Sequence, residues 1–207
     1  MNTIVTIGRE YGSGGREIGE IVAKKLGVAF YDKEILTRAA SDSGICEEVI
    51  HSHDEKGGVG GLFSAASGLG VSSMAGAPLT LQMPLNQRVF LAQFDAITKL
   101  AAEGSCVVVG RCADYVLKET PGVTHVFLYA SLEKRIERIM RVEQTDYSNA
   151  KELVRKVDKQ RKSYYNFFAD GNWGLRSNYD LMVRTDDRAP DDIADMIVKF
   201  VAERKAN

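Results

Sequence analysis

The sequence predicts an α/β fold in which helices cover both faces of a doubly wound parallel sheet. Stretches with strand character alternate almost throughout with stretches whose apolar residues recur at helical spacing. Residues 105–109 form an apolar run that suits a central parallel strand. A β-branched run near the start breaks into a glycine-dense loop and then into a helix. We therefore expect one domain over residues 1–207, a length that allows one sizeable core.

The first expected element is a strand over residues 3–7. A loop with glycines at positions 8, 12, 14 and 15 follows it, and then a helix from Arg16 to Leu26 that ends at Gly27. Glycine lets the loop backbone approach a ligand closely, and the helix N-terminus offers unpaired N–H groups and a positive dipole end. The loop therefore predicts a phosphate site, with a tight turn that binds nothing as the alternative.

A short strand over residues 28–31 comes next and delivers Asp32 at its C-terminal end, where open α/β sheets place ligand-binding groups. A helix over 33–40 follows, and its pattern fades by Gly44. Residues 51–84 are rich in Gly, Ala and Ser and show no sustained period. Because a structureless stretch this long is usually functional or disordered, we expect a mobile insertion there.

Regular structure resumes after the insertion. In chain order we expect a helix over 86–103, a strand over 105–109, a short helix over 115–118, a strand over 123–129, a helix that begins at Ser131, a helix over 149–165, a strand over 179–185 and a helix after Pro190. Arg111 follows the strand over 105–109 and would emerge at the carboxyl edge of the sheet, beside the glycine loop. It is a candidate to hold an anion, and a helix-capping or surface arginine is the alternative.

The helix that begins at Ser131 carries Arg135, Arg138 and Arg141 along one side. An anion clamp and a solvated ion-pair face are both open, and a position at the sheet edge would favour the clamp. The acidic residues near enough to pair with the arginines are Glu133, Glu137 and Glu143.

Composition excludes some function classes. Lys and Arg number 27 and Asp and Glu 28, so the net charge of -1 indicates no general attraction for nucleic acid or for an anionic membrane. The three cysteines have neither metal-ligand nor disulfide spacing, and their odd number suits a reducing compartment. No apolar run reaches the length of a membrane span, and we expect a cytoplasmic protein without a leader segment. The oligomeric state is not indicated.

The glycine loop matches the Walker phosphate-binding pattern only in part. In that pattern backbone N–H groups cradle the phosphates, a lysine neutralises their charge and a following hydroxyl holds magnesium. Alignment on the end of the loop places Gly15 where the lysine belongs and puts Arg16 and Glu17 after it. Gly8 lies one residue too far away. Spacing alone is therefore weak support for this type of site.

Two further hypotheses come from other classes of protein. The glycine spacing 8, 12, 14 and the pair Tyr147 and Lys151 imitate short-chain NAD(P) dehydrogenases, although the catalytic serine of that family would fall near Lys134. The missing loop lysine instead fits a regulatory nucleotide-binding module with weak or no catalysis. Intact ATP binding without turnover would favour the module, and NAD(P)H binding would favour the dehydrogenase.

Several stretches together carry a likeness to a known family. They are residues 7–19, 30–34, 108–115, 158–165 and 178–181. With these stretches the chain resembles the cytidylate kinase-like branch of the nucleoside monophosphate kinases, over nearly its whole length. The resemblance implies a three-layer fold of the P-loop NTPase type, ATP and Mg²⁺ as cofactors, and a small-molecule nucleotide substrate. It also implies that residues 51–84 lie in the acceptor-binding region and that about 135–176 form a lid-like helical region.

The resemblance also implies roles for acceptor-site residues. Asp32 and Arg38 look like the family's aspartate and arginine that contact the nucleotide acceptor, and Asp158 and Arg161 look like a second such pair. Arg111 keeps the phosphate-binding arginine of the family's D-G-R-D element, but both aspartates of that element are absent. The substitute we expect for them is Asp114.

At the loop, the resemblance implies that the ATP phosphates are bound by Gly8, Gly12, Ser13, Gly14, Gly15, Arg16 and Glu17. Magnesium would be assisted by Ser13 and Asp32, with Glu17 as another candidate. We expect Arg16 to supply the missing lysine's charge, although it is bulkier and displaced by one position. Arg138 and Arg141 would join Arg16 at the transferred phosphoryl group. The resulting hypothesis is an ATP-dependent kinase of a nucleoside monophosphate, CMP or dCMP first.

Overall fold

The sheet is parallel throughout and has the strand order β2-β3-β1-β4-β5. The structure is a computed structural model that describes residues 2–53, 83–169 and 171–206. The strands are β1 (Ile4–Arg9), β2 (Ala29–Tyr31), β3 (Cys106–Val109), β4 (Val123–Tyr129) and β5 (Leu181–Arg184). This arrangement confirms the predicted α/β fold with a doubly wound parallel sheet.

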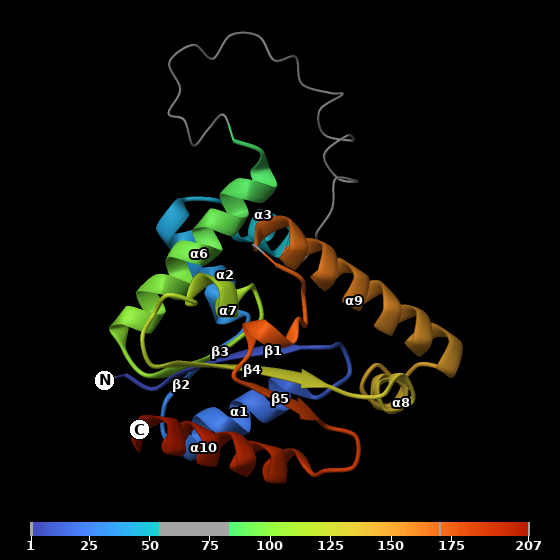
Figure 1. The fold of residues 1–207 in the computed structure, drawn as a ribbon. Helices are drawn as coiled ribbons and strands as arrows, with labels where there is room; N and C mark the ends of the chain where they lie inside the picture. The colour runs from blue at the N-terminus through green and yellow to red at the C-terminus, as the bar shows by residue number, and fades with distance from the viewer. Residues whose placement is uncertain (1, 54–82, 170, 207) are drawn as a thin grey trace, which may run out of the picture.

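Helices lie on both faces of the sheet (Figure 1). On one face lie α1 (Gly15–Leu26) and α10 (Pro190–Ala206), which also contact each other. The opposite face carries α2 (Glu34–Ser43), α3 (Glu47–His53), α6 (Leu85–Glu103) and α7 (Ala113–Val116). Beyond the carboxyl end of β4 lie α8 (Leu132–Val142) and α9 (Tyr147–Phe168), while η2 (Arg176–Asn178) leads into β5.

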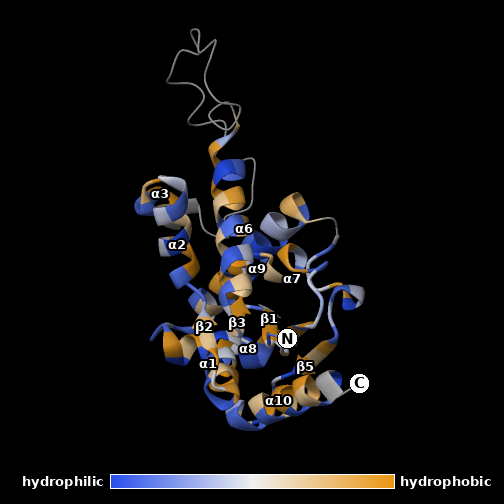
Figure 2. Cartoon of the chain, turned by 90° about the vertical axis from the view of Figure 1, so that its left-hand side faces the viewer, coloured by the Kyte–Doolittle hydropathy of each residue, from blue (hydrophilic) through white to orange (hydrophobic). Residues whose placement is uncertain are grey.

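The core has one apolar cluster on each face of the sheet, because successive strand residues point to opposite faces. Val5 and Ile7 of β1 pack with α1 and α10, whereas Ile4 packs with α2 and α6. Figure 2 shows the strands as a largely hydrophobic layer between the two sets of helices. Burial on both faces explains why the central strands read as apolar runs.

The register brings the carboxyl ends of the central strands together. Ile7 of β1 pairs with Val109 of β3, and Arg9 pairs with Leu128 of β4. The residues that follow these strands therefore meet at one edge of the sheet, the edge at which ligands bind in open α/β sheets. This edge holds the glycine loop and Arg111, as the sequence predicts.

The sequence prediction missed one helix, α3, which spans Glu47–His53. It lies where the helical pattern was expected to fade and where the insertion was expected to begin. The remainder of the predicted insertion, residues 54–82, lies outside the described residues. Within the ranges that the structure describes, none of the helices has the length and apolar character needed to cross a membrane.

Candidate active site

Strand β1 ends in the glycine loop, whose backbone reaches α1 through left-handed positions. Gly12 has φ +82° and Gly14 has φ +85°, a conformation that side chains disfavour. A Cβ on Gly12 would also lie 2.8 Å from the carbonyl oxygen of Arg135, so α8 packs against the loop without space for one. The loop therefore ends at the N-terminus of a twelve-residue helix whose first N–H groups lack intrahelical partners.

A cavity of about 750 Å³ opens at this loop. Gly12, Gly14 and Gly15 form part of its wall. Its basic side chains come from six places in the fold and are Arg9, Arg16, Lys33, Arg111, Arg138 and Arg161. Its acidic side chains are Glu10, Glu17, Glu20, Asp32 and Glu143. Five of the six basic side chains are arginines, and guanidinium groups around glycine-rich backbone suit a polyanionic ligand.

Asp32 and Arg111 form a buried ion pair at the carboxyl ends of the neighbouring strands β2 and β3. Their side chains are only 8% and 3% exposed. Arg16 also donates to Asp32, at 2.8 Å. Burial alone would raise the pKa of Asp32, but Arg111, Arg9 and Arg16 outweigh it and hold that pKa below its ordinary value. Asp32 is therefore a carboxylate that orients two arginines of the cavity.

Arg111 reaches Asp32 because the backbone after β3 is left-handed over three residues. The φ angles are +76° at Gly110, +51° at Arg111 and +55° at Cys112. Positive φ at two consecutive non-glycine residues is uncommon and costs energy, and such strain gathers at functional sites. The turn sends the guanidinium back over the strand end, where it also donates to the carbonyl of Val109 at 3.1 Å.

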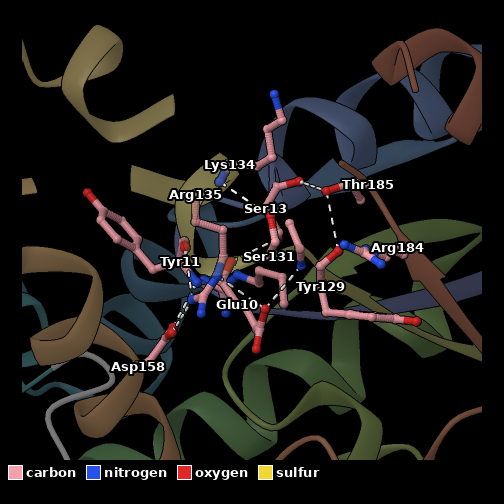
Figure 3. A network of polar contacts seen from close by, with 12 residues as sticks. Glu10, Tyr11, Ser13, Tyr129, Ser131, Lys134, Arg135, Asp158, Arg184 and Thr185 are labelled. Carbon is pink, nitrogen blue, oxygen red and sulfur yellow. Dashed lines mark hydrogen bonds and ion pairs between the residues drawn. The ribbon is translucent and has the colours of Figure 1, made fainter. Parts of the chain in front are cut away.

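Arg135 joins α8 to the glycine loop and to α9. Its guanidinium forms ion pairs with Asp158 of α9 and with Glu10, the latter at 3.3 Å (Figure 3). Asp158 also accepts a hydrogen bond of 2.8 Å from the backbone N–H of Tyr11. Burial raises the pKa of Glu10 despite a hydrogen bond from the N–H of Ala130. Arg135 therefore pairs with carboxylates outside its own helix, which differs from the ion-pair face that was one of the two alternatives for this helix.

Arg161 and Asp158, three residues apart on α9, both contact the loop. Arg161 donates to the carbonyl of Arg9 at 3.3 Å, and its guanidinium lies 5.5 Å from the centre of the Tyr11 ring. The Tyr11 hydroxyl in turn donates to Glu143 at 3.0 Å, and burial first, then Glu143, raises the Tyr11 pKa to about 12. Asp158 and Arg161, both predicted to contact the acceptor, therefore also hold the backbone of the glycine loop.

Arg138 lies directly over the loop. Its Nη1 atom would be 2.6 Å from a Cβ on Gly14, and it pairs with Glu17 at 2.8 Å. Arg138 and Glu17, both predicted as loop-site residues, are thus brought together at the start of α1. This position at the sheet edge favours the anion-clamp interpretation for Arg138.

Ser13 faces away from the cavity. Its hydroxyl donates to the carbonyl of Glu10 at 2.8 Å, its own carbonyl accepts from the Thr185 hydroxyl at 2.9 Å, and the residue is 1% exposed. In this conformation its oxygen does not fit a magnesium ligand. Across the described parts of the chain no group of three or more His, Cys, Asp or Glu side chains could hold a metal. The available fit is Asp32, an ionised carboxylate beside the phosphate loop, acting through water.

A second, small cavity lies next to the first and has aromatic walls. Gly8, Arg111 and Arg161 line it together with Tyr165. Asp114 points into this cluster, accepts a hydrogen bond of 2.7 Å from Tyr165, and burial raises its pKa. Asp114 is therefore near the site, where the sequence places it.

Two predicted residues lie outside the cavity. Arg38 pairs with Asp42 at 3.1 Å and with Glu103 at 2.8 Å, on the outer side of α2. Arg141 is exposed on α8 and does not line the cavity. Their roles in binding and catalysis stay predictions.

The dehydrogenase pair also lies away from the glycine loop. Tyr147 is 44% exposed, donates to Glu133 at 3.1 Å and has the Lys151 ammonium over its ring. A catalytic tyrosine needs to reach a substrate beside the dinucleotide, and neither residue lines the cavity. The geometry therefore gives the dehydrogenase hypothesis no support.

The family follows from a match over most of the chain. The model of the cytidylate kinase-like family matches residues 4–187. The chain belongs to this family. The matched range contains the glycine loop, Asp32, Arg111 and both helices that contact the loop from beyond β4. The residues that line the cavity thus all lie within the range that the cytidylate kinase-like model matches.

Solved structures share the fold. An uncharacterized protein from Eubacterium ventriosum is 27% identical with a TM-score of 0.72, over 97% of this chain and 98% of that one. Shikimate kinase from Acinetobacter baumannii is 16% identical with a TM-score of 0.53, over 100% and 96%. That from Bacteroides thetaiotaomicron is 13% identical with a TM-score of 0.54, over 98% and 99%. The two shikimate kinases are similar in fold alone.

One curated protein is similar over part of the chain. A uronate isomerase from Corynebacterium glutamicum is 30% identical over 98 residues. The match covers 47% of this chain and 19% of that protein, so the chain spans about a fifth of this relative. It therefore carries no argument about the site.

Sequence reasoning missed two loop residues that the site uses. Arg9 and Tyr11 stand between the glycines, and both line the cavity. The signal for Arg9 was its place at the carboxyl end of a central strand, the end at which Asp32 also lies relative to its own strand. No pattern in the sequence indicates that Tyr11 would contact α9.

Proposed function

We propose that this cytidylate kinase-like protein transfers the γ-phosphoryl group of ATP to a nucleoside monophosphate, with CMP or dCMP as the first candidates. The observation that carries the proposal is the cavity at the glycine loop, where six basic side chains surround backbone of the phosphate-binding type. Membership of the family supports nucleotide use. The base preference rests on the family resemblance alone.

In the proposed reaction an oxygen of the acceptor phosphate attacks the γ-phosphorus, the bond from that phosphorus to the β–γ bridging oxygen breaks, and ADP leaves. No general base is required, because the acceptor phosphate is already charged. Arg111 and Arg161 hold the acceptor phosphate, and Asp32 keeps Arg111 oriented. Arg138 comes from α8 to the transferred group. Positioning and charge neutralisation supply most of the rate in such reactions.

Magnesium fits this proposal through Asp32. Magnesium usually keeps several waters and takes one or two carboxylates together with the phosphates. Asp32 would meet it through water, because both of its oxygens already accept from arginines. The bound ion would neutralise charge on the β- and γ-phosphates. Location in the cytoplasm stays a prediction from the sequence, based on its cysteines and on the expected lack of a leader and of a membrane span.

A regulatory nucleotide-binding module is the second candidate. The glycine at position 15 favours it, because a Walker loop without its lysine loses charge at the transferred group. Such a module would bind ATP at the same loop without transferring phosphate. The two candidates differ in turnover and not in binding.

The test is a turnover panel with the purified chain, ATP, Mg²⁺ and each of the nucleoside monophosphates, read as ADP release, with ATP binding measured in parallel by calorimetry. We expect acceptor-dependent ADP release that is highest with CMP or dCMP. ATP binding without turnover on any acceptor would favour the module. Absence of ATP binding would overturn both candidates.

A further inference from the structure

Position 15 has no room for a side chain, because Arg9 fills the space. A Cβ built on Gly15 would lie 2.6 Å from the Cβ and 2.7 Å from the Cγ of Arg9, and 3.7 Å from its Cδ. Real Cβ atoms essentially never approach others so closely. In a Walker loop this position carries the lysine whose stem passes over the loop to the phosphates. Here the methylene stem of Arg9 occupies the start of that path.

The backbone fixes where Arg9 begins. It is the last residue of β1, in register with Leu128 of β4, and its carbonyl accepts a hydrogen bond from Arg161 at 3.3 Å. Its side chain lines both the large cavity and the small aromatic one. Its charge is among the influences that lower the pKa of Asp32, which locates the guanidinium in the field of the site. The stem and the charge thus point along the loop to the cavity.

We propose that Arg9 supplies the cation that a Walker loop takes from its lysine, and that position 15 is glycine because the Arg9 stem lies there. This inference rests on the proposed function for its ligand, the β- and γ-phosphates of ATP. A guanidinium binds phosphate oxygens in pairs and stays charged at any working pH. No covalent step passes through Arg9, which only neutralises and orients the phosphates.

Arg16 is the competing candidate, and its contacts direct it elsewhere. It donates to Asp32 at 2.8 Å and to Glu20 at 3.0 Å. Its guanidinium lies 5.9 Å from the centre of the Phe30 ring, and its side chain is 47% exposed. Arg16 therefore extends from α1 toward the end of β2, with partners for two of its nitrogens.

The first experiment compares Arg9→Gln, Arg16→Gln and the control Arg155→Gln, an exposed arginine of α9 outside both cavities. Glutamine keeps the Cβ and Cγ that pack on Gly15, so Arg9→Gln removes charge and leaves the packing. Binding of ATP and of ADP is measured by calorimetry, and turnover is measured with the best acceptor. We expect Arg9→Gln to weaken ATP binding about 30-fold and kcat about 100-fold. We expect Arg155→Gln to match the native chain.

The outcomes separate this inference from the proposed function. A larger loss of ATP affinity and turnover in Arg16→Gln than in Arg9→Gln would overturn the role of Arg9. Equal small losses of both quantities in the two variants would overturn it as well. ATP binding that depends on Arg9 in a chain with no turnover would uphold the inference and reject the kinase. A native chain that binds no ATP would overturn both.

A lysine transplant tests the shared space. Gly15→Lys alone places its Cβ against Arg9 and is expected to lose most ATP binding. Arg9→Gly combined with Gly15→Lys removes the clash and restores the Walker arrangement. Glycine rather than alanine is used at position 9, because alanine would keep the Cβ that conflicts with a side chain at position 15. We expect the double variant to bind ATP at least tenfold more tightly than Arg9→Gly alone. A double variant no better than Arg9→Gly would show that the two stems do not occupy one path.

Discussion

The substitution Asp32→Asn tests the buried ion pair independently of any activity. Asp32 and Arg111 come from the ends of neighbouring strands, and their side chains are 8% and 3% exposed. Asparagine has nearly the same shape and still accepts a hydrogen bond. It removes the carboxylate charge that faces the buried Arg111 guanidinium, and it also removes one of the two carboxylates that pair with Arg16. The perturbation is therefore the loss of a charged partner at both arginines.

The expected loss in unfolding free energy is large because removing one partner of a buried ion pair is costly. Breaking a buried ion pair on one side costs about 3–5 kcal/mol, and the remaining hydrogen bonds place this variant near the lower end, at about 3 kcal/mol. For a chain of this size each kcal/mol lowers the melting temperature by roughly 2–4 °C. We therefore expect a melting temperature roughly 6–12 °C below that of the native chain.

The unfolding free energy is measured in urea and the melting temperature in a thermal melt, both monitored by circular dichroism at pH 7 with no nucleotide present. The matched control is Asp191→Asn, which removes an exposed partner of Lys25 and should change the unfolding free energy little. Arg111→Gln and the double variant complete a cycle that isolates the pair. An Asp32→Asn variant within about 1 kcal/mol of the native chain, or additive single losses, would refute the assignment of a buried, mutually dependent pair.

The difference in unfolding free energy between the native chain and Asp32→Asn should also depend on pH, with a defined sign. The pKa of Asp32 is lowered in the folded chain, so its stabilisation is complete above the ordinary carboxyl pKa, 3.8, and is lost as pH falls through the lowered folded value. The native chain and Asp32→Asn should thus differ most near neutral pH and converge in acid. A gap that widens in acid would contradict the sign of the shift.

Three further predictions concern the remaining contacts. In thermal melts Gly12→Ala should destabilise the chain by about 1–3 kcal/mol more than Gly27→Ala does, because both glycines have positive φ but only Gly12 lies against Arg135. Equal losses of stability would contradict this contact. Burial lowers the pKa of His125, so unfolding free energy should fall as pH drops below 6.5, and His125→Gln should remove that part of the slope in a urea series. Asp158→Asn should lower the unfolding free energy measured in urea by about 1–3 kcal/mol, because Arg135 loses a partly buried counter-charge, and no change would show that Glu10 suffices.

Much of the site could be predicted because its residues follow strand ends. Asp32 and Arg111 each follow a strand, and parallel strands bring such positions to one edge whatever the side chains do afterwards. Their pairing could not be predicted in full, since it depends on positive φ at Arg111 and Cys112. Residues other than glycine rarely adopt positive φ, so the sequence does not indicate this conformation. The helix α3 was missed because seven residues are too few for a clear helical period.

The sequence by itself determined the layered parallel sheet, the glycine loop before α1 and the sheet edge at which the candidate site lies, because apolar periodicity and glycine act locally. Only the tertiary structure decided which cations surround that loop. Arg161 meets the Arg9 carbonyl across 152 residues, and the Arg9 stem, rather than that of Arg16, lies over Gly15. Side-chain direction depends on the neighbours that the fold supplies. The glycine in place of a lysine at position 15 is therefore explained only by the way β1 packs against α1.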